Sequence, residues 1–526
     1  MNVTVVETSS LGDRTYLLHH GDTAVVVDPQ RDIDRVLAAA GRLGARITHV
    51  AETHLHNDYV SGGLALSRVT GASYLVAAAE EVSFDRVPVA GGDLIDIGEG
   101  LRLRVIATPG HTFNHLAYAV QDGDRPLAVC TGGSLLYGTT GRTDLLGSSF
   151  AAELAHRQHA SAHHLAALLP AATPVWPTHG FGSFCSVAPA DVASSTIGRE
   201  LTANSVFRLS ADAFAADLIA SLRPYPAYYA HMGARNAAGA GPIDLSPVRR
   251  ASAGELHDRL AAGEWVVDLR ARKAFAYQHL AGSLSFGVDG PLATWLGWLL
   301  PPGTPVTLLG ESPGQIAEAQ RELARIGIDR PAAAATGTPA EWGPASSMRT
   351  ATFAELRAAL PGIAVLDVRR QDEWDAGHID GAHHIPLPTL SERLADLPPS
   401  SGRSEKLPAT SERRGAVGSL PGRSGELPAT SERRGAVGSL PGRSGELPVL
   451  SERRGDVGSL PGRSGELPVL SERLGGLPID TEIWVHCAAG YRAAAAASLL
   501  LRAGLRVVHV DDLWENAAAA GLTVAG

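Results

Sequence analysis

Short apolar runs alternate with helical stretches through the first 240 residues of the chain. Residues 23–28, 47–50 and 101–106 are apolar runs of strand length, and residues 33–43 are typical of a helix. Loops that contain histidine follow several of these predicted strands. The pattern predicts an α/β domain over residues 1–240 with its polar chemistry at the ends of strands.

The pattern restarts after Pro242 and then repeats itself. Each copy has a predicted strand that ends in an Asp-x-Arg sequence, followed by a histidine and then a glycine. The aspartate-to-histidine gap is 11 residues in both copies and the histidine-to-glycine gap is 3: Asp268, His279 and Gly282 in the first, Asp367, His378 and Gly381 in the second. These matched spacings predict an internally duplicated α/β domain, with copies over residues 247–345 and 350–526.

A repeat of 20 residues interrupts the second copy. Ser-Glu-Arg recurs at residues 391, 411, 431, 451 and 471, and the text between these positions is nearly identical. Each unit has few Leu or Val residues among many Gly, Pro, Ser and Arg, which favours a disordered insertion at about 391–470 over a folded array. Because loop-closure entropy grows only logarithmically with loop length, the host domain is expected to tolerate it.

The composition narrows the class of protein. A chain of 526 residues with 44% hydrophobic content exceeds one core and predicts about three domains. Its net charge of -10 argues against a nucleic-acid partner. No apolar run is long enough for a membrane span and the first residues do not resemble a signal peptide, so we expect a cytoplasmic protein without a membrane partner. Three cysteines far apart suit a reactive thiol better than a disulfide framework.

A candidate metal site follows the strand at residues 47–50. His54 and His56 are two residues apart and can face one ion, and Asp58 lies on the same loop. A second metal would need a nitrogen or carboxylate donor at residue 59, where Tyr59 offers a phenol that is a poor ligand at neutral pH. The segment therefore predicts one metal ion.

Two further histidines follow later strands, His111 in Thr-Pro-Gly-His-Thr and His179 in Pro-Thr-His-Gly. Together with residues 28–32, 141–144 and 179–185, these motifs resemble the persulfide dioxygenases of the metallo-β-lactamase fold and their rhodanese fusions. The resemblance implies an αββα sandwich over residues 1–240. It also implies one Fe(II) per chain, with Zn²⁺ as the alternative ion, held by His54, His111 and an aspartate.

The expected aspartate is missing. Gly133 stands at its position in Thr131-Gly132-Gly133, so water, Asp58 or another nearby group has to complete the shell. Glyoxalase II enzymes share the fold but bridge two metals through a histidine and an aspartate that are here Tyr59 and Gly133, which disfavours a thioester hydrolase. His56, Asp58 and His179 are then expected to orient the ligands or to serve as alternative ones.

Arg142 and Asp144 lie in one of the motifs that carry the resemblance. A guanidinium fork suits a carboxylate, so the two residues are candidates for binding the thiol that carries the sulfur. A structural salt bridge between them explains the sequence equally well.

Cys487 begins the sequence Cys-Ala-Ala-Gly-Tyr-Arg between a predicted strand at 482–486 and a predicted helix at 493–501. A tight turn of small residues directs backbone N–H groups inward, and the helix start adds positive potential, so the turn can stabilise a thiolate and its persulfide. The loop resembles the rhodanese active site, with Cys487 as nucleophile and Arg492 closing the loop or receiving an anionic donor. Asp511-Asp512 depart from that family's paired glycines. The first copy has no cysteine at the corresponding strand end, which predicts an inactive domain.

These features predict an α/β multidomain enzyme of sulfur metabolism. A mononuclear iron site would oxidise a thiol persulfide to sulfite, and Cys487 would transfer sulfur as a persulfide. The alternative is an N-terminal domain that only binds a thiol or persulfide, beside an active sulfurtransferase. The expected small-molecule partners are a low-molecular-weight thiol persulfide and thiosulfate or sulfite; the sequence leaves homo-oligomer formation open.

Overall fold

A computed structural model describes residues 1–186, 192–395, 470, 472–522 and 524–525. These residues belong to one compact unit, formed by residues 1–401 and 470–526. Within the described ranges, no helix has the length and apolar character that crossing a bilayer requires.

The first part of the chain builds a six-stranded sheet whose first three strands are antiparallel and whose remaining strands are parallel. Its strands, in sheet order, are β1 (Asn2–Thr8), β2 (Asp13–His20), β3 (Thr23–Val27), β4 (Arg46–Ala51), β5 (Ser73–Ala77) and β6 (Val87–Val89). Helices α1 (Asp34–Leu43) and α2 (Gly63–Thr70) cover one face of this sheet through a shared apolar cluster.

A second six-stranded sheet packs against the first. Its order is β12 (Ser195–Thr196), β11 (Pro174–Pro177), β10 (Arg125–Gly132), β9 (Leu116–Asp122), β8 (Leu101–Ala107) and β7 (Leu94–Gly98). Alternate side chains of both sheets, among them Tyr16, Val27, Leu103 and Tyr118, form the core between them. The outer face is covered by α3 (Ala151–Leu168), α4 (Ile197–Ala203), η2 (Ser205–Phe207) and α5 (Ala211–Ser221), and η1 (Ser148–Phe150) directly precedes α3.

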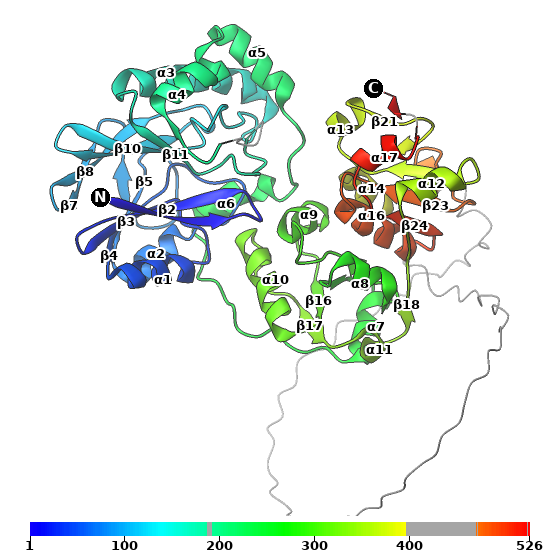
Figure 1. Ribbon diagram of the computed structural model, residues 1–526. Helices are drawn as coiled ribbons and strands as arrows, with labels where there is room; N and C mark the ends of the chain where they lie inside the picture. Colours follow the sequence, from blue (N-terminus) through cyan, green and yellow to red (C-terminus); the bar gives the residue numbers. More distant parts are fainter. Residues whose placement is uncertain (187–191, 396–469, 471, 523, 526) are drawn as a thin grey trace, which may run out of the picture. The chain divides into compact units, whose positions relative to one another are not determined.

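The layers run helix, sheet, sheet, helix, with α1 and α2 on one side and α3, α4 and α5 on the other (Figure 1). This arrangement agrees with the αββα sandwich predicted from the sequence. Helix α6 (Tyr229–Ala238) ends this part of the chain, and Asn236 from it donates to the carbonyls of His56 and Tyr59. The predicted strands at 23–28, 47–50 and 101–106 and the predicted helix at 33–43 are all present within one or two residues.

The remaining described residues form two parallel sheets of similar design. The first contains β15 (Leu284–Ser285), β13 (Trp265–Asp268), β16 (Val306–Gly310) and β17 (Ala333–Thr336), with α7 (Ala253–Ala261), α8 (Arg272–Tyr277), α9 (Leu292–Leu299), α10 (Pro313–Arg325) and α11 (Pro339–Trp342) around it. A two-stranded ribbon joins β14 (His279–Leu280) to β18 (Ala345–Ser346).

The second sheet has the order β19 (Arg349–Ala351), β24 (Val507–Val510), β23 (Ile483–His486), β20 (Ala364–Asp367) and β22 (His383–His384). Its helices are α12 (Phe353–Ala359), α13 (Gln371–Asp375), α14 (Leu387–Ala395), α16 (Tyr491–Arg502) and α17 (Glu515–Ala519), and β21 (His378–Ile379) pairs with β25 (Val524–Ala525). One apolar cluster is shared by both copies and includes Leu308 and Leu366.

The repeated sequence spacing has a repeated structural basis. Arg270 forms an ion pair with Asp268 at 2.6 Å and donates to the carbonyl of Gln278 at 2.7 Å. Arg369 forms the same pair with Asp367 at 2.7 Å and donates to Gly377 at 2.7 Å. The shared contacts support the interpretation as a duplication.

Helix α14 extends through Ala395, so residues 391–395 of the expected insertion form part of a helix. Ser391 and Leu394 are buried there, and the carbonyl of Leu470 accepts from the N–H of Leu474 on the far side of the insertion. The start predicted at about residue 391 is therefore a few residues too early. Residues 396–469 of the insertion, for which disorder was predicted, lie outside the described residues.

Candidate functional site

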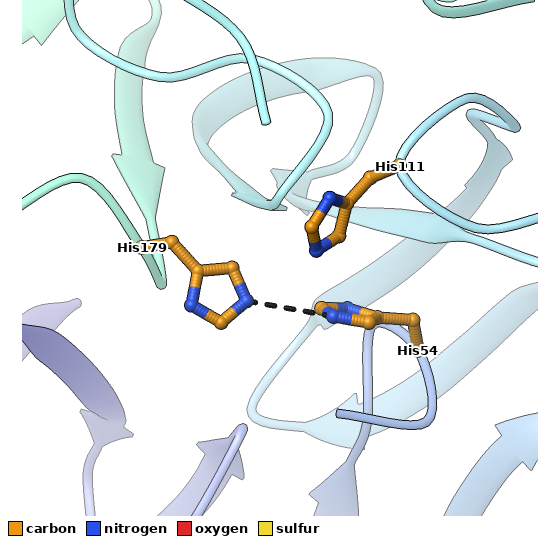
Figure 2. Close-up of side chains that lie close together, drawn as sticks. All are labelled: His54, His111 and His179. Carbon is orange, nitrogen blue, oxygen red and sulfur yellow. Dashed lines mark hydrogen bonds between the residues drawn. The ribbon is translucent and has the colours of Figure 1, made fainter. Parts of the chain in front are cut away.

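Three histidines from separate strand ends meet inside the first domain. His54 follows β4, His111 follows β8 and His179 follows β11, and all three are buried. Figure 2 shows their rings converging, with Nε2 of His179 lying 3.4 Å from Nε2 of His54. One ring nitrogen of each lies within 4.8 Å of the others, which is a separation that one metal ion can span.

Hydrogen bonds to the opposite ring nitrogens orient these imidazoles. Nδ1 of His111 lies 2.7 Å from the carbonyl oxygen of Arg142, so that nitrogen is the N–H donor and Nε2 is the free base. Nδ1 of His54 lies 2.9 Å from the Thr53 hydroxyl. Among the described residues, no hydrogen-bond partner reaches Nε2 of His111, although the atom is buried. A buried nitrogen of this kind fits a metal ligand.

Burial lowers the pKa of His111 to about 3 and that of His54 well below its ordinary value, with the neighbouring histidines adding to both shifts. Both rings are therefore neutral at physiological pH, the form that binds metals. His179 differs, because Nδ1 is 2.9 Å from Asp13 Oδ1 and 3.0 Å from Asp58 Oδ2. Burial opposes the shift, but these carboxylates raise the pKa of His179 to about 10.

The three imidazoles are a donor set suited to Zn²⁺ or Fe(II), and an ion that binds His179 takes the place of the proton on its Nε2. His179 provides the third nitrogen at a site where the sequence lacked a carboxylate. Asp58, which the sequence offered as an alternative third ligand, instead binds His179 and accepts from the Ser183 hydroxyl at 3.1 Å. A carboxylate behind a ligating histidine fixes the ring and strengthens its basicity.

His56 has different partners. Its Nε2 lies 3.2 Å from Asp28 Oδ1, 3.3 Å from Glu52 Oε2 and 2.9 Å from the Tyr59 hydroxyl. After the opposing effect of burial, the two carboxylates raise the pKa of His56 to about 9. Burial also raises the pKa of Tyr59 well above its ordinary value, so the phenol stays protonated. Two further groups have ligand atoms within 4.8 Å of one another: Asp28, Glu52 and His56, and His56, Asp58 and His179. A second ion next to them would still lack a good ligand at residue 59, because the Tyr59 phenol is a poor donor.

Gly133 has no side chain at a point where the His111 ring leaves no room for one. A Cβ on Gly133 would lie 2.3 Å from Cδ2 and 2.6 Å from Cγ of that ring. The backbone N–H of Gly133 donates to Nε2 of His115 at 3.0 Å. The position expected to hold an aspartate is thus occupied in space by the second predicted ligand.

We expect Gly133→Asp to lower both metal content and stability, because the new side chain must displace the His111 ring at a cost of about 1–3 kcal/mol. Metal per chain by mass spectrometry and the thermal midpoint would measure the two effects. Gly254→Asp is the matched control, since a Cβ on this glycine of α7 meets nothing closer than 3.9 Å. A rise in iron content with Gly133→Asp would show instead that the carboxylate enters the shell.

Arg142 and Asp144 form a bidentate ion pair at 2.7 and 2.8 Å. Nη1 of Arg142 donates to the carbonyl of Phe184 at 2.9 Å, Nη2 also donates to that of Arg223 at 2.7 Å, and the side chain is only 3% exposed. With its donors bound to protein groups, the guanidinium favours the structural salt bridge over the binding of a thiol carrier.

Cys487 lies at the carboxyl end of β23, in the turn before α16. The N–H of Gly490 donates to its Sγ at 3.1 Å, and the side chain is 2% exposed. The turn thus directs a backbone donor at the sulfur, as the sequence predicted, and the start of α16 adds positive potential. Cys130 and Cys185 are also free and buried.

Arg492 is bound by both oxygens of Glu373, which holds the loop closed. Burial opposes the effect, but Glu373 and the nearby Cys487 raise the pKa of Arg492. The guanidinium also lies 5.6 Å from the centre of the Trp295 ring. Of the two roles considered from the sequence, this geometry favours loop closure.

Sequence reasoning missed Asp13, His115 and Glu373. Asp13 holds His179, His115 accepts from Gly133, and Glu373 holds Arg492. None stands at a recognisable spacing from its partner in the sequence, so only the fold could reveal these contacts.

Comparison with known proteins adds two assignments. Residues 14–163 match the metallo-beta-lactamase superfamily, and residues 352–412 match the rhodanese-like domain. The chain contains a metallo-β-lactamase domain and a rhodanese-like domain. The first match includes His54 and His111, whereas the second ends within the repeats, upstream of Cys487.

Curated relatives of the metallo-β-lactamase domain are named hydroxyacylglutathione hydrolase. The protein from Methylobacillus flagellatus is 39% identical over 104 residues, which are 20% of this chain and 41% of the relative. The protein from Ectopseudomonas mendocina is 36% identical over 157 residues, 30% of this chain and 56% of the relative. The chain therefore spans about half the length of these relatives.

Among solved structures, a metallo-beta-lactamase from Staphylococcus aureus subsp. aureus COL is 25% identical with a TM-score of 0.58. The match covers 64% of this chain and 99% of that one, so it extends well beyond the first domain. ETHE1 from Myxococcus xanthus is 29% identical with a TM-score of 0.39, over 45% of this chain and 99% of its own.

Proposed function

We propose that the metallo-β-lactamase domain oxidises the sulfane sulfur of a thiol persulfide to sulfite, and that Cys487 transfers sulfane sulfur in the rhodanese-like domain. The observation that carries the proposal is the pairing, within one chain, of a buried three-imidazole site with a cysteine in a strand-to-helix turn. The Cys-less copy at residues 247–345 is proposed to be an inactive rhodanese domain.

We assign one Fe(II) per chain to His54, His111 and His179. When bound, iron would supply the activation of O2 that a persulfide needs for oxidation. The protein's own contribution is orientation: Arg142 and Thr53 fix the rings of His111 and His54, while Asp13 and Asp58 hold His179. The reaction balances as one persulfide, one O2 and one water giving one thiol and one sulfurous acid, with four electrons passing from sulfur to oxygen.

Sulfur transfer at Cys487 needs no added oxidant. The thiolate attacks the sulfane sulfur of thiosulfate, the S–S bond to the cysteine forms, and sulfite leaves with the electron pair of the broken bond. An acceptor thiolate then takes the outer sulfur and restores Cys487. Gly490 stabilises the sulfur charge through its N–H, and the Arg492–Glu373 pair fixes the turn.

A chain of aromatic contacts joins the histidine site of the first domain to the Cys487 turn, and it supports a coupled function. Phe184, in the loop after His179, meets Trp298 edge-on at 5.3 Å. Trp298 stacks on Trp295 at 5.3 Å, and Trp295 contacts Arg492. Helix α9 of the Cys-less copy thus contacts one loop of each centre.

A thioester hydrolase is the second candidate, because the curated relatives are named hydroxyacylglutathione hydrolase. It requires a second metal with a ligand at residue 59, where the Tyr59 hydroxyl instead contacts His56. The test supplies iron-loaded protein with glutathione persulfide and, separately, with a hydroxyacylglutathione thioester. Oxygen uptake with the first and no thiol release from the second is expected; thiol release without oxygen uptake would favour the hydrolase.

A further inference from the structure

The Cys-less copy contacts the Cys487 turn directly. The Tyr491 hydroxyl donates to the carbonyl of Gly287 at 3.0 Å. A Cβ on Gly290 would lie 2.2 Å from the Tyr491 ring, so the ring rests on bare backbone. Farther along α16, Ser498 accepts from the N–H of Ser285 at 3.0 Å. One wall around the turn is therefore built by residues of the first copy.

Arg272, the first residue of α8, reaches this turn. Its Nε donates to Asp511 Oδ1 at 2.6 Å. Gly490 has a φ of +87°, and a Cβ there would lie 2.5 Å from Asp511 Oδ1 and 2.9 Å from Arg272 Nε. The pair thus packs against the residue whose N–H binds Cys487 Sγ. Asp511 is one of the two aspartates that replace the glycines expected from the rhodanese resemblance.

The guanidinium of Arg272 still has donors to offer. No group of the described residues accepts a hydrogen bond from its Nη1 or Nη2, and the side chain is 30% exposed. Arg492 differs, because both of its Nη atoms are bound to Glu373 and its side chain is 11% exposed. Asp511 compensates part of the charge on Arg272 but occupies only the Nε edge of the fork.

We propose that Arg272, positioned by Asp511, is the residue that recognises the anionic end of the sulfur donor used by Cys487. The Cys-less copy would thereby contribute to substrate binding. A planar fork with both Nη atoms unbound suits the oxygens of a sulfonate such as that of thiosulfate. Arg272 takes no part in bond making or breaking. This inference rests on the proposed sulfur transfer at Cys487.

Steady-state kinetics of the full chain test the assignment. Arg272→Ala is expected to raise KM for thiosulfate about ten- to a hundred-fold, the range for a lost charge-assisted hydrogen bond, with a much smaller change in kcat. Arg272→Lys should restore part of the loss, since it keeps the charge without the fork. Arg349→Ala is the matched control, because this 58% exposed arginine pairs with Glu482. Unchanged KM in Arg272→Ala, with a lower thermal midpoint, would show that the pair only joins the two copies.

A second readout separates this inference from the proposed function. Iodoacetate and iodoacetamide alkylate a thiolate by the same displacement of iodide, but the first is an anion and the second is neutral. The rate with iodoacetate divided by the rate with iodoacetamide is measured at Cys487 on its peptide by mass spectrometry. This ratio is expected to fall about ten-fold in Arg272→Ala, because only the anion loses the attraction of the guanidinium. An unchanged ratio would overturn the role of Arg272. A fall in the ratio, in a protein that transfers no sulfur from thiosulfate, would uphold anion recognition and reject the sulfurtransferase.

Discussion

Replacing Cys487 by serine is expected to abolish sulfur transfer from thiosulfate while leaving the fold intact. Serine is close to cysteine in size and can accept the N–H of Gly490 in place of Sγ, so the turn should survive. The hydroxyl is a far weaker nucleophile than a thiolate and cannot store sulfur as a persulfide. Sulfite release would measure sulfur transfer, and the mass of the peptide that contains residue 487 after incubation with thiosulfate would show whether the side chain stores sulfur.

The matched control is Cys130→Ala, a change at another buried free cysteine that lies in β10 of the first domain. It should leave sulfur transfer unaltered even if it costs some stability. Persistent transfer in Cys487→Ser, or sulfur found on a peptide other than that of Cys487, would contradict the assignment.

His179→Ala is expected to remove most of the bound metal, although the resemblance to persulfide dioxygenases points only to His54, His111 and an aspartate. The variant leaves two imidazoles and leaves Asp13 and Asp58 without their common partner. Loss of residues behind a ligand already lowers metal affinity about 10–100-fold, so loss of a ligand should cost at least as much. Competition with a chelator of known affinity gives the metal dissociation constant directly.

His159→Ala provides the comparison, since this partly exposed histidine of the same domain contacts the Leu209 carbonyl at 3.1 Å and the rings of His163 and Phe214, none of which belongs to the metal site. It should bind metal like the unaltered protein. Equal metal affinity in His179→Ala would mean that the third ligand is another group, and the three-imidazole site would have to be abandoned.

The sequence predicted the strand ends that carry His54 and Cys487 because each depends on residues that are close together in the chain. The apolar run before His54 and the small-residue turn after His486 each place a reactive side chain at a strand end, and both are where the sequence put them. The duplication was visible for the same reason, since Asp-x-Arg and the following histidine and glycine repeat at fixed spacing.

Contacts between distant segments could not be predicted in this way. Gly133 indicated a missing ligand, but the sequence does not show that the His111 ring fills its space. Asp13 is 166 residues from His179, and Arg272 is 239 residues from Asp511. Such pairs depend on how the sheets and the two copies pack, so the spacing of residues along the chain does not reveal them.

The end of the insertion-bearing helix shows the same limit on a smaller scale. The sequence predicted an insertion from about residue 391, yet α14 extends to Ala395 because Leu394 packs into the shared core. This tertiary packing sets the helix boundary, and the repeat of Ser-Glu-Arg gives no sign of it.

The proposed persulfide oxidation is best tested by following oxygen consumption and sulfite formation together, with iron-loaded protein and glutathione persulfide as substrate. We expect one sulfite for each O2 consumed, with both lost in His54→Ala and both retained in Cys487→Ser. No oxygen uptake by protein that contains one iron per chain would contradict it and would leave the first domain as a thiol- or persulfide-binding module beside the sulfurtransferase.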